Sequence, residues 1–133
     1  MLVTRQGDYA VRCALELARA PGEVASARRI AARTLVPPSF LAKILQRLVK
    51  ARIAASVRGV DGGFRLARNP KDVSLHDVLK AVRGTPSINT CAVEGGRCRM
   101  SRACAVHSVW VDIRRDLDAR LKSETLAKLL AKR

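Results

Sequence analysis

The amino-acid sequence predicts a mainly helical fold with one small β-hairpin, and three observations support this prediction. Apolar residues recur at the three- and four-residue spacing of amphipathic helices along much of the chain. Two short strand-like runs near the middle flank a glycine-rich turn. The 133 residues are enough for one domain with a hydrophobic core, and no internal repeat, linker or low-complexity segment interrupts them.

Three helices are expected before the hairpin. They are residues 8–20, 27–34 and 39–51. Pro21 and Gly22 end the first helix, and Ser26 is expected to cap the second. The third helix opens at Pro37 and Pro38, and it has one apolar face and one polar face. A helix of this kind can pack on a core and still present polar side chains to a partner.

The hairpin is expected from residues 53–57 and 64–66, with the glycine-rich turn 58–63 between them. Two helices, an amphipathic third helix and a hairpin follow the order of a winged helix-turn-helix. The sequence therefore predicts a winged helix-turn-helix, with the hairpin as its wing.

Helical patterns return after the hairpin. A helix should begin at Ser74, with Asp77 completing a short capping box. A long apolar stripe at helical spacing runs over residues 106–121, and a short leucine-rich piece follows it. We expect a DNA-binding winged domain, then a cysteine-containing loop, then a long helix with its tail. These parts are residues 1–84, 85–105 and 106–133.

The charge of the chain is strongly one-sided. Lys and Arg number 26 against 11 Asp and Glu, which gives a formal net charge of +15. Residues 24–60 contain no acidic residue at all. A field of one sign suits a polyanionic partner, and nucleic acid is the first candidate, although a merely solvated basic face is the competing interpretation. Within this stretch we expect DNA contacts from Arg28, Arg29 and Arg47.

Three cysteines and one histidine are concentrated in a single segment. Cys91, Cys98, Cys104 and His107 fall within seventeen residues. Soft thiolates grouped in this way favour an iron–sulfur cluster or zinc. The first residues lack the apolar region of a signal peptide, so we expect a cytoplasmic protein whose reduced thiols bind metal. Cys13, inside the first expected helix, is interpreted as a small buried residue.

Other interpretations compete with a DNA-binding metal sensor. Zinc could use the same four side chains, although zinc sites usually contain two ligands only two to four residues apart. His107 could be a packed histidine, and Asp8 could be an acid favoured by the helix dipole. An RNA-binding protein is disfavoured by one Trp, one Tyr and two Phe, because single-strand binders stack bases on aromatic rings. An enzyme is not expected, because paired carboxylates, a nucleophile elbow and a phosphate loop are missing from the sequence.

Residues 4–12, the expected wing 56–66 and the cysteine segment together resemble the Rrf-two family of bacterial winged-helix iron–sulfur regulators. The resemblance covers nearly the whole chain. It implies a homodimer joined through the helix over residues 106–121, a recognition helix in the major groove and a wing that reaches the minor groove. The residues that it places on DNA are Ser39, Ala42, Lys43 and Arg58. In the wing, Gly59, Gly62 and Gly63 allow a tight turn and a close approach to the DNA backbone.

The resemblance also implies a cluster held by the three cysteines of the segment and by a fourth ligand that stays open. His107 matches the histidine that completes a 2Fe–2S site in one type of member. Asp8 matches an aspartate that reaches a 4Fe–4S cluster from the partner subunit in another type. The spacing from Cys91 to Cys98 is one residue longer than in the 2Fe–2S type. We favour 4Fe–4S, because a ligand in the first helix of the other chain would couple cluster loss to DNA binding.

The implied function is a homodimeric transcriptional regulator that binds double-stranded promoter DNA. It would sense redox state, nitric oxide or iron through the cluster, with no membrane and no small-molecule substrate among its partners. The alternative is a winged-helix regulator that holds a structural zinc ion or no metal.

Overall fold

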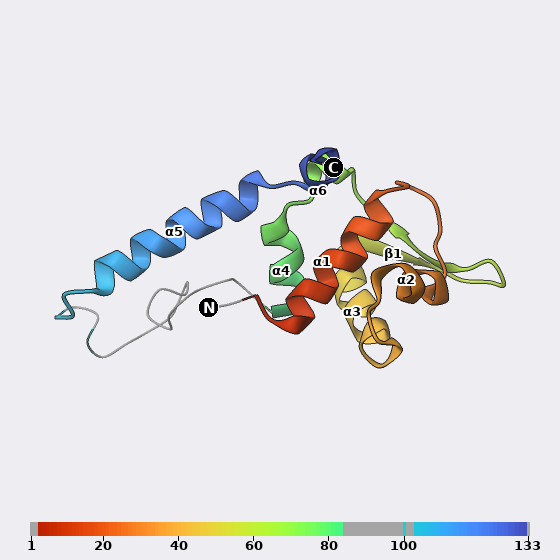
Figure 1. The fold of residues 1–133 in the computed structure, drawn as a ribbon, viewed down its shortest axis with the longest axis horizontal. Coiled ribbons are helices and arrows are strands. Elements are labelled where there is room, and N and C mark those ends of the chain that lie inside the picture. Colours follow the sequence, from red (N-terminus) through yellow and green to blue (C-terminus); the bar gives the residue numbers. More distant parts are fainter. Residues whose placement is uncertain (1–2, 84–99, 101–102, 133) are drawn as a thin grey trace.

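The structure is a computed structural model, and it describes residues 3–83, 100 and 103–132 (Figure 1). The elements in chain order are α1 (Arg5–Ala18), α2 (Ala27–Thr34), α3 (Pro38–Lys50), β1 (Ala54–Val57), β2 (Gly63–Leu66), the 3-10 helix η1 (Pro70–Asp72), α4 (Leu75–Arg83), α5 (His107–Ser123) and α6 (Leu126–Ala131). The two strands form one antiparallel sheet. The predicted mainly helical fold with a hairpin wing is therefore confirmed.

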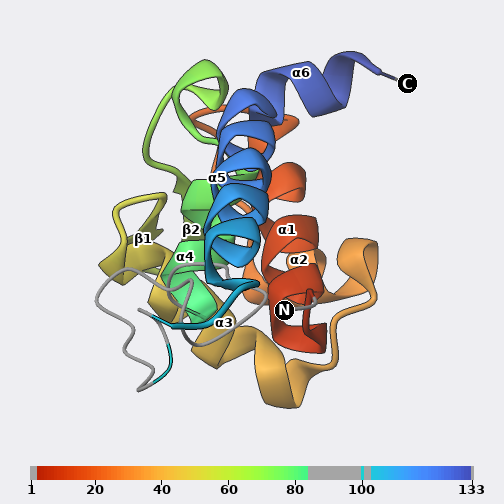
Figure 2. The ribbon, with the colours of Figure 1, turned by 90° about the vertical axis from the view of Figure 1, so that its left-hand side faces the viewer.

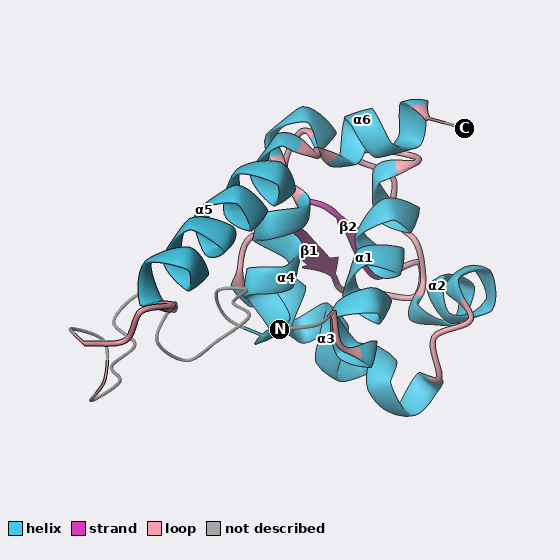
Figure 3. Ribbon diagram, turned by 60° about the vertical axis from the view of Figure 1, so that its left-hand side comes forward, coloured by secondary structure: helices cyan, strands magenta, loops and turns pink. Residues whose placement is uncertain are grey.

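The helices α1 to α4 form a cluster from which the hairpin projects on one side and α5 on the other (Figure 1). Figure 2 shows α5 passing in front of α1 and α4, and its contacts are with α4. The chain then turns, and α6 lies across the top of the cluster (Figure 3). Of the helices that the structure describes, none is both long enough and apolar enough to cross a membrane.

Helix α1 begins at Arg5, three residues before the expected start. The Thr4 hydroxyl accepts a hydrogen bond from the Gly7 amide at 3.2 Å and so caps the helix. Gly7 is buried, and a Cβ atom there would come within 3.0 Å of a Leu79 methyl group. Gly7 therefore lets α1 approach α4 closely. The other buried residues of α1 are Ala10, Cys13, Ala14, Leu17 and Ala18.

The second and third helices follow the expected pattern closely. Helix α2 has the predicted bounds, and the Ser26 hydroxyl accepts from the Arg29 amide at 3.1 Å. Helix α3 begins at Pro38, where the fixed φ of proline fits the first turn and its missing N–H costs no hydrogen bond. The buried side chains of α3 are Leu41, Ile44, Leu45 and Leu48. They form the core of the domain together with the buried face of α1.

The hairpin is tied to the segment that precedes α2. Ser56 pairs with Phe64 in the β1–β2 register. On the other side of β2, Phe64 and Ala25 exchange two backbone hydrogen bonds, each of 2.8 Å. A Cβ atom on Gly63 would collide with the Ala25 carbonyl oxygen, so this close pairing requires glycine. The wing is thus fixed to the helix-turn-helix at its base.

The predicted capping box of α4 is present in full. The Ser74 amide donates to the Asp77 carboxylate at 3.0 Å, and the Asp77 amide donates to the Ser74 hydroxyl at 3.1 Å. The same Ser74 pairs with Thr125, and the Leu126 amide donates to the Val73 carbonyl at 2.9 Å. Leu126 is fully buried in the core. The residues after α5 therefore return to the winged helix-turn-helix.

Candidate nucleic-acid interface and cysteine segment

One face of α3 is open to solvent. Ser39, Ala42, Lys43 and Gln46 are all exposed. Their three- and four-residue spacing places them along one side of the helix, opposite the leucines that enter the core. This face combines a hydroxyl, a methyl group, an ammonium group and an amide. These are groups that can contact base edges in a major groove.

The turn between α2 and α3 contains a residue in an unusual backbone conformation. Leu35 has a φ of 60°, and its side chain is 77% exposed. The Leu35 amide donates to the Ala31 carbonyl at 3.0 Å and ends α2. The buried Thr34 hydroxyl donates to the Ile30 carbonyl at 2.6 Å and accepts from the Val36 amide at 3.3 Å. These bonds fix the angle at which α3 leaves α2.

Arg58 lies at the exposed start of the wing turn. Gly59 has a φ of 118°, and its carbonyl accepts from the Gly62 amide at 3.0 Å. A Cβ atom on Gly62 would strike the Val57 carbonyl oxygen, so this turn has no room for a side chain there. Val60 is fully exposed at the tip. The wing thus presents one guanidinium and a bare backbone turn to solvent.

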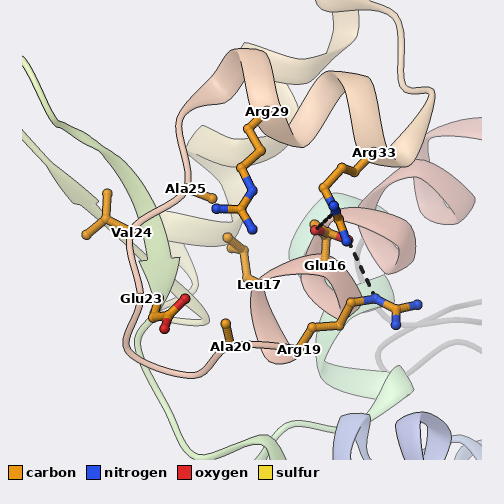
Figure 4. Close-up of a pocket in the computed structure, with 9 residues that line it drawn as sticks. All are labelled: Glu16, Leu17, Arg19, Ala20, Glu23, Val24, Ala25, Arg29 and Arg33. Carbon is orange, nitrogen blue, oxygen red and sulfur yellow. Dashed lines mark ion pairs between the residues drawn. The ribbon is translucent and has the colours of Figure 1, made fainter.

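The consecutive residues Arg28 and Arg29 face different neighbours. Arg28 lines a groove between α2, α3 and β2. Arg29 lines a separate pocket beside α1, and Figure 4 shows its side chain directed toward Ala25 and Leu17. Adjacent residues on a helix point about 100° apart, which explains the divergence. Only Arg28 of this pair lies on the same side as the exposed face of α3.

The pocket beside α1 is organised around a half-buried carboxylate that sequence reasoning missed. The Glu16 carboxylate lies 2.7 Å from the Arg33 guanidinium and 3.5 Å from that of Arg19 (Figure 4). The Glu16 side chain is only 10% exposed. The pair with Arg33 joins α1 to α2 and supports the helix-turn-helix from behind. Only the side-by-side approach of two helices makes this pair, so sequence spacing carried no signal for it.

Arg47 is bound within the protein. Its Nη1 donates to the Val82 carbonyl at 2.9 Å and to the Gln6 amide oxygen at 3.1 Å. The residue is half-buried. Arg47 thereby connects α3 with α4 and with α1. Of the residues expected on DNA, it is the one whose guanidinium makes hydrogen bonds inside the fold.

The groove beside Arg28 has a volume of about 440 Å³. We call it the α2–α3 groove. Buried Leu41 and Leu45 of α3 contribute to its lining, together with Phe64 of β2. The exposed residues Ala42 and Gln46 line it from α3, facing Arg28 of α2. The groove is thus an apolar recess next to the polar face of α3.

The sequence-predicted metal ligands are only partly described. Cys91 and Cys98 lie outside the described residues. His107 is the first residue of α5, and Cys104 lies three residues before it. The Cys104 amide donates to the Met100 carbonyl at 2.6 Å, and the Cys104 carbonyl accepts from the His107 amide at 3.3 Å. A backbone turn just before α5 thus joins the two residues. Within the described part of the chain, the buried Nδ1 of His107 has no hydrogen-bond partner.

Asp8 takes part in a different set of contacts. Its carboxylate lies 2.8 Å from the Arg12 guanidinium, and its side chain is 52% exposed. Arg12 lies over the ring of Tyr9, 5.6 Å from the ring centre, and donates to the Thr34 carbonyl at 3.3 Å. Thr34 is the last residue of α2. Asp8 is therefore connected through one side chain to the turn of the helix-turn-helix.

Over residues 3–83, 100 and 103–132, no three His, Cys, Asp or Glu side chains gather into a group that could hold a metal ion. Asp8 belongs to α1 and His107 begins α5, and these two helices begin in different parts of one protomer (Figures 1 and 3). Cys13 is fully buried, and burial raises the pKa of its thiol to about 11. A thiol in that state is no thiolate ligand at neutral pH.

Helix α5 presents apolar side chains to solvent. Val106, Val109 and Ile113 are 38%, 48% and 39% exposed. No residue of α5 is buried, although the helix has 17 residues. The apolar stripe predicted from the sequence therefore lies largely uncovered in a single protomer. Exposed apolar patches of this kind mark surfaces for association.

Comparison with known proteins finds transcriptional regulators, in agreement with the exposed helix and the basic side chains described above. The Rrf2 family model, described as an iron-dependent transcriptional regulator, matches residues 3–132. The HTH-type transcriptional regulator IscR of Klebsiella pneumoniae (strain 342) is 31% identical over 98% of this chain and 80% of its own length. IscR of Vibrio vulnificus (strain YJ016) is 30% identical over 98% of this chain and 78% of its own length.

Solved structures give the same result. The structure of T. potens IscR covers 99% of this chain and 88% of its own, with a TM-score of 0.80 and 28% identity. The structure of CymR, the global cysteine regulator of B. subtilis, also has a TM-score of 0.80, at 24% identity, and it supports the fold alone. The exposed α3, the wing and the family match all lead to one conclusion. The chain belongs to the Rrf2 family and is a helix-turn-helix transcriptional regulator, not an enzyme.

Proposed function

We propose that this regulator is a homodimer that binds promoter DNA and senses redox state, nitric oxide or iron through an iron–sulfur cluster. The observation that supports it most is the turn that brings Cys104 close in the chain to His107, the first residue of α5. The Nδ1 of His107 is buried and has no hydrogen-bond partner among the described residues, and half-buried Cys104 lies three residues before it in the chain. A thiolate is a soft ligand and an imidazole nitrogen also binds iron, so both suit such a cluster, and the IscR names of the relatives point the same way.

Cys91, Cys98 and Cys104 would hold the cluster, with His107 or Asp8 as the fourth ligand. When bound, the cluster supplies a group that oxidants or nitric oxide can modify or remove. Asp8 of one protomer would act on the cluster segment of the other, because the two regions lie apart within one chain. In the 4Fe–4S form the fourth ligand would be Asp8, and in the 2Fe–2S form it would be His107.

The protein part of the signal can be followed from Asp8 inward. Arg12 bonds to Asp8 and to the last carbonyl of α2 at the same time. If the Asp8 carboxylate turns away from Arg12, the guanidinium is free to shift at Thr34. A shift there changes how the turn at Leu35 holds α3. The effect on DNA affinity is limited to the difference in binding energy between the two arrangements.

On the DNA side, Ser39, Ala42 and Lys43 would read bases and Arg58 would enter the minor groove. A narrow A·T-rich minor groove has a strong negative potential that attracts arginine. Arg28 is placed to contact the phosphate backbone, and Gly59, Gly62 and Gly63 allow the wing to approach it. Arg29 and Arg47 contribute by supporting the fold, since they face α1 and the α3–α4 junction.

The dimer would form through α5. Its exposed Val106, Val109 and Ile113 need a partner surface, and a second copy of α5 offers the same stripe by symmetry. Ile113→Glu should therefore convert the dimer to a monomer in analytical ultracentrifugation. Asp112→Ala, an exposed change on the same helix, should leave the dimer intact. A dimeric Ile113→Glu variant would count against α5 as the interface.

The direct test is to count iron, acid-labile sulfide and zinc per chain in protein purified without oxygen, and to measure promoter binding before and after cluster removal. Four irons with four sulfides would support the 4Fe–4S form, and two of each the 2Fe–2S form. Asp8→Ala and His107→Ala then identify the fourth ligand by the loss of visible absorbance. One zinc without sulfide, or no metal, would overturn the sensing proposal. The protein would then be a winged-helix regulator with a structural zinc ion or with no metal.

A further inference from the structure

The α2–α3 groove lies where a recognition helix would meet DNA, yet most of its lining is apolar. Its lining is apolar apart from the guanidinium of Arg28 and the amide of Gln46. Gln46 follows Ala42 by four residues, so the two side chains share one side of α3. Both are exposed, whereas Leu41 and Leu45 behind them are buried. The groove is therefore an apolar recess with a methyl group and an amide on one wall.

The chemistry of base edges limits what can fill this recess. The C5 methyl group of thymine is the one apolar group that a base pair exposes in the major groove. Alanine and other small apolar side chains contact that methyl group. Glutamine can donate from its Nε2 to N7 of adenine and accept at its Oε1 from the N6 amino group in a bidentate pair. Both groups on the groove wall thus suit the two members of an A·T pair.

Arg28 faces this wall from α2. A guanidinium is suited to a phosphate oxygen, and a phosphate contact fixes the position of the duplex without reading its sequence. With Arg28 on the backbone, the bases beneath α3 are brought against Ala42 and Gln46. The charge of the chain, +15, favours such a placement of a polyanion.

We infer that the α2–α3 groove is a sequence-reading site for A·T pairs, in which Gln46 pairs with adenine and the apolar recess beside Ala42 receives the methyl group of a thymine. This inference rests on the proposed function, because it requires α3 to lie in the major groove. It adds Gln46 as a specificity-determining residue and gives the bases read at one end of the recognition helix.

The test begins with selection of binding sites from a random DNA library, using the full-length protein purified without oxygen. The wild-type protein should enrich sites with an A·T pair at a fixed position in each half-site. Gln46→Ala should lose the preference at that position alone, with an affinity for the wild-type site roughly 5- to 150-fold lower. Lys71→Ala, on η1 next to α6 and remote from α3, is the control and should retain the full preference.

Base analogues then separate the two contacts. Uracil in place of the thymine removes only the methyl group and should weaken wild-type binding about fourfold. 7-Deazaadenine removes the N7 acceptor and should weaken wild-type binding but not Gln46→Ala. Ala31→Leu fills the groove from α2 and should abolish the discrimination between thymine and uracil. Thermal melting of each variant verifies that the variant is folded.

The outcomes are distinguishable. An enriched site whose base preference is the same for wild type and Gln46→Ala would overturn this inference and leave the regulator proposal standing. Equal binding to thymine and uracil would overturn the role of the recess in the same way. If no sequence is enriched by the wild-type protein, the proposed function fails and this inference fails with it.

Discussion

Arg47 of α3 donates a hydrogen bond of 2.9 Å to the backbone carbonyl of Val82 in α4. Lys43, one turn earlier on the same helix, is exposed to solvent. Two basic residues four positions apart thus have different tasks, one inside the fold and one on the surface. This difference leads to the first prediction.

Arg47→Ala should lower the free energy of unfolding by roughly 1.5–3 kcal/mol, because a hydrogen bond from a charged group to a buried carbonyl is lost. Lys43→Ala should change that free energy by less than about 0.5 kcal/mol but weaken DNA binding and alter its sequence preference. Urea unfolding and DNA titration of both variants check this. If Arg47→Ala is as stable as the wild type, Arg47 does not stabilise the fold through its bond to Val82.

Leu35→Gly should stabilise the protein. A leucine at a φ of 60° carries strain of about 1 kcal/mol that glycine does not. The side chain is 77% exposed, so its removal costs little buried surface. We expect an increase in unfolding free energy of about 0.5 kcal/mol by urea unfolding. Leu35→Ala keeps the strain and is the control; equal effects of the two substitutions would show that backbone conformation is not the cause.

Acid should weaken the contact between α4 and α5. His76 is buried next to Asp118, with Nε2 3.6 Å from the carboxylate. Burial lowers the pKa of His76 below its usual 6.5, and the negative charge of Asp118 opposes this only in part. The unfolded chain therefore binds a proton at a pH where the folded chain does not. The contribution of His76 to stability is complete above pH 6.5 and is lost as the pH falls below it.

The measurement is the melting temperature of wild type and His76→Gln at pH 7.5 and pH 5.5. The other charged groups near His76 are Lys122 on α5 and Asp77 and Lys80 on α4. These groups remain in the variant, so the difference between the two proteins isolates the histidine. We expect a smaller acid-induced drop for His76→Gln. An equal drop in melting temperature for the two proteins would exclude His76 as the cause of the acid sensitivity.

Cys13 should resist alkylation in the folded protein. Its thiol is buried and its pKa is raised to about 11, so almost no thiolate is present at pH 8. Cys104 is half-buried and should react in metal-free protein. Mass spectrometry after brief iodoacetamide treatment, with a urea-unfolded sample as the control, measures both sites. Modification of Cys13 at the same rate as Cys104 would contradict the buried position.

Much of this fold could be predicted because its signals are local. The Ser74–Asp77 capping box and the Ser26 cap were predicted from the sequence, and both are present. The start of α1 was placed too late, because Thr4 caps it through the amide of Gly7, a residue with low helix propensity. Propensity alone gave no sign that α1 extends through this glycine.

The surface of the site was harder to predict because it depends on tertiary contacts. Arg28 and Arg29 are equivalent in the sequence, but helix geometry sends one to the α2–α3 groove and the other toward α1. The partners of Arg47 are 35 and 41 residues away in the chain, and no local pattern connects them. Glu16 was missed for the same reason, since its carboxylate meets Arg33 only when α1 and α2 pack together.

The junction after α5 has a mechanical consequence. Glu124 bonds to Arg120 at 3.4 Å and to Lys132 at 3.3 Å, and buried Leu126 follows directly. Helix α5 is therefore anchored at its C-terminal end, whereas its exposed apolar residues Val109 and Ile113 lie toward the other end. At 17 residues it is a lever arm about 25 Å long. A tilt of about 5° at Glu124 moves Cys104 and His107 by roughly 2 Å, so small rotations at the anchor are amplified at the far tip.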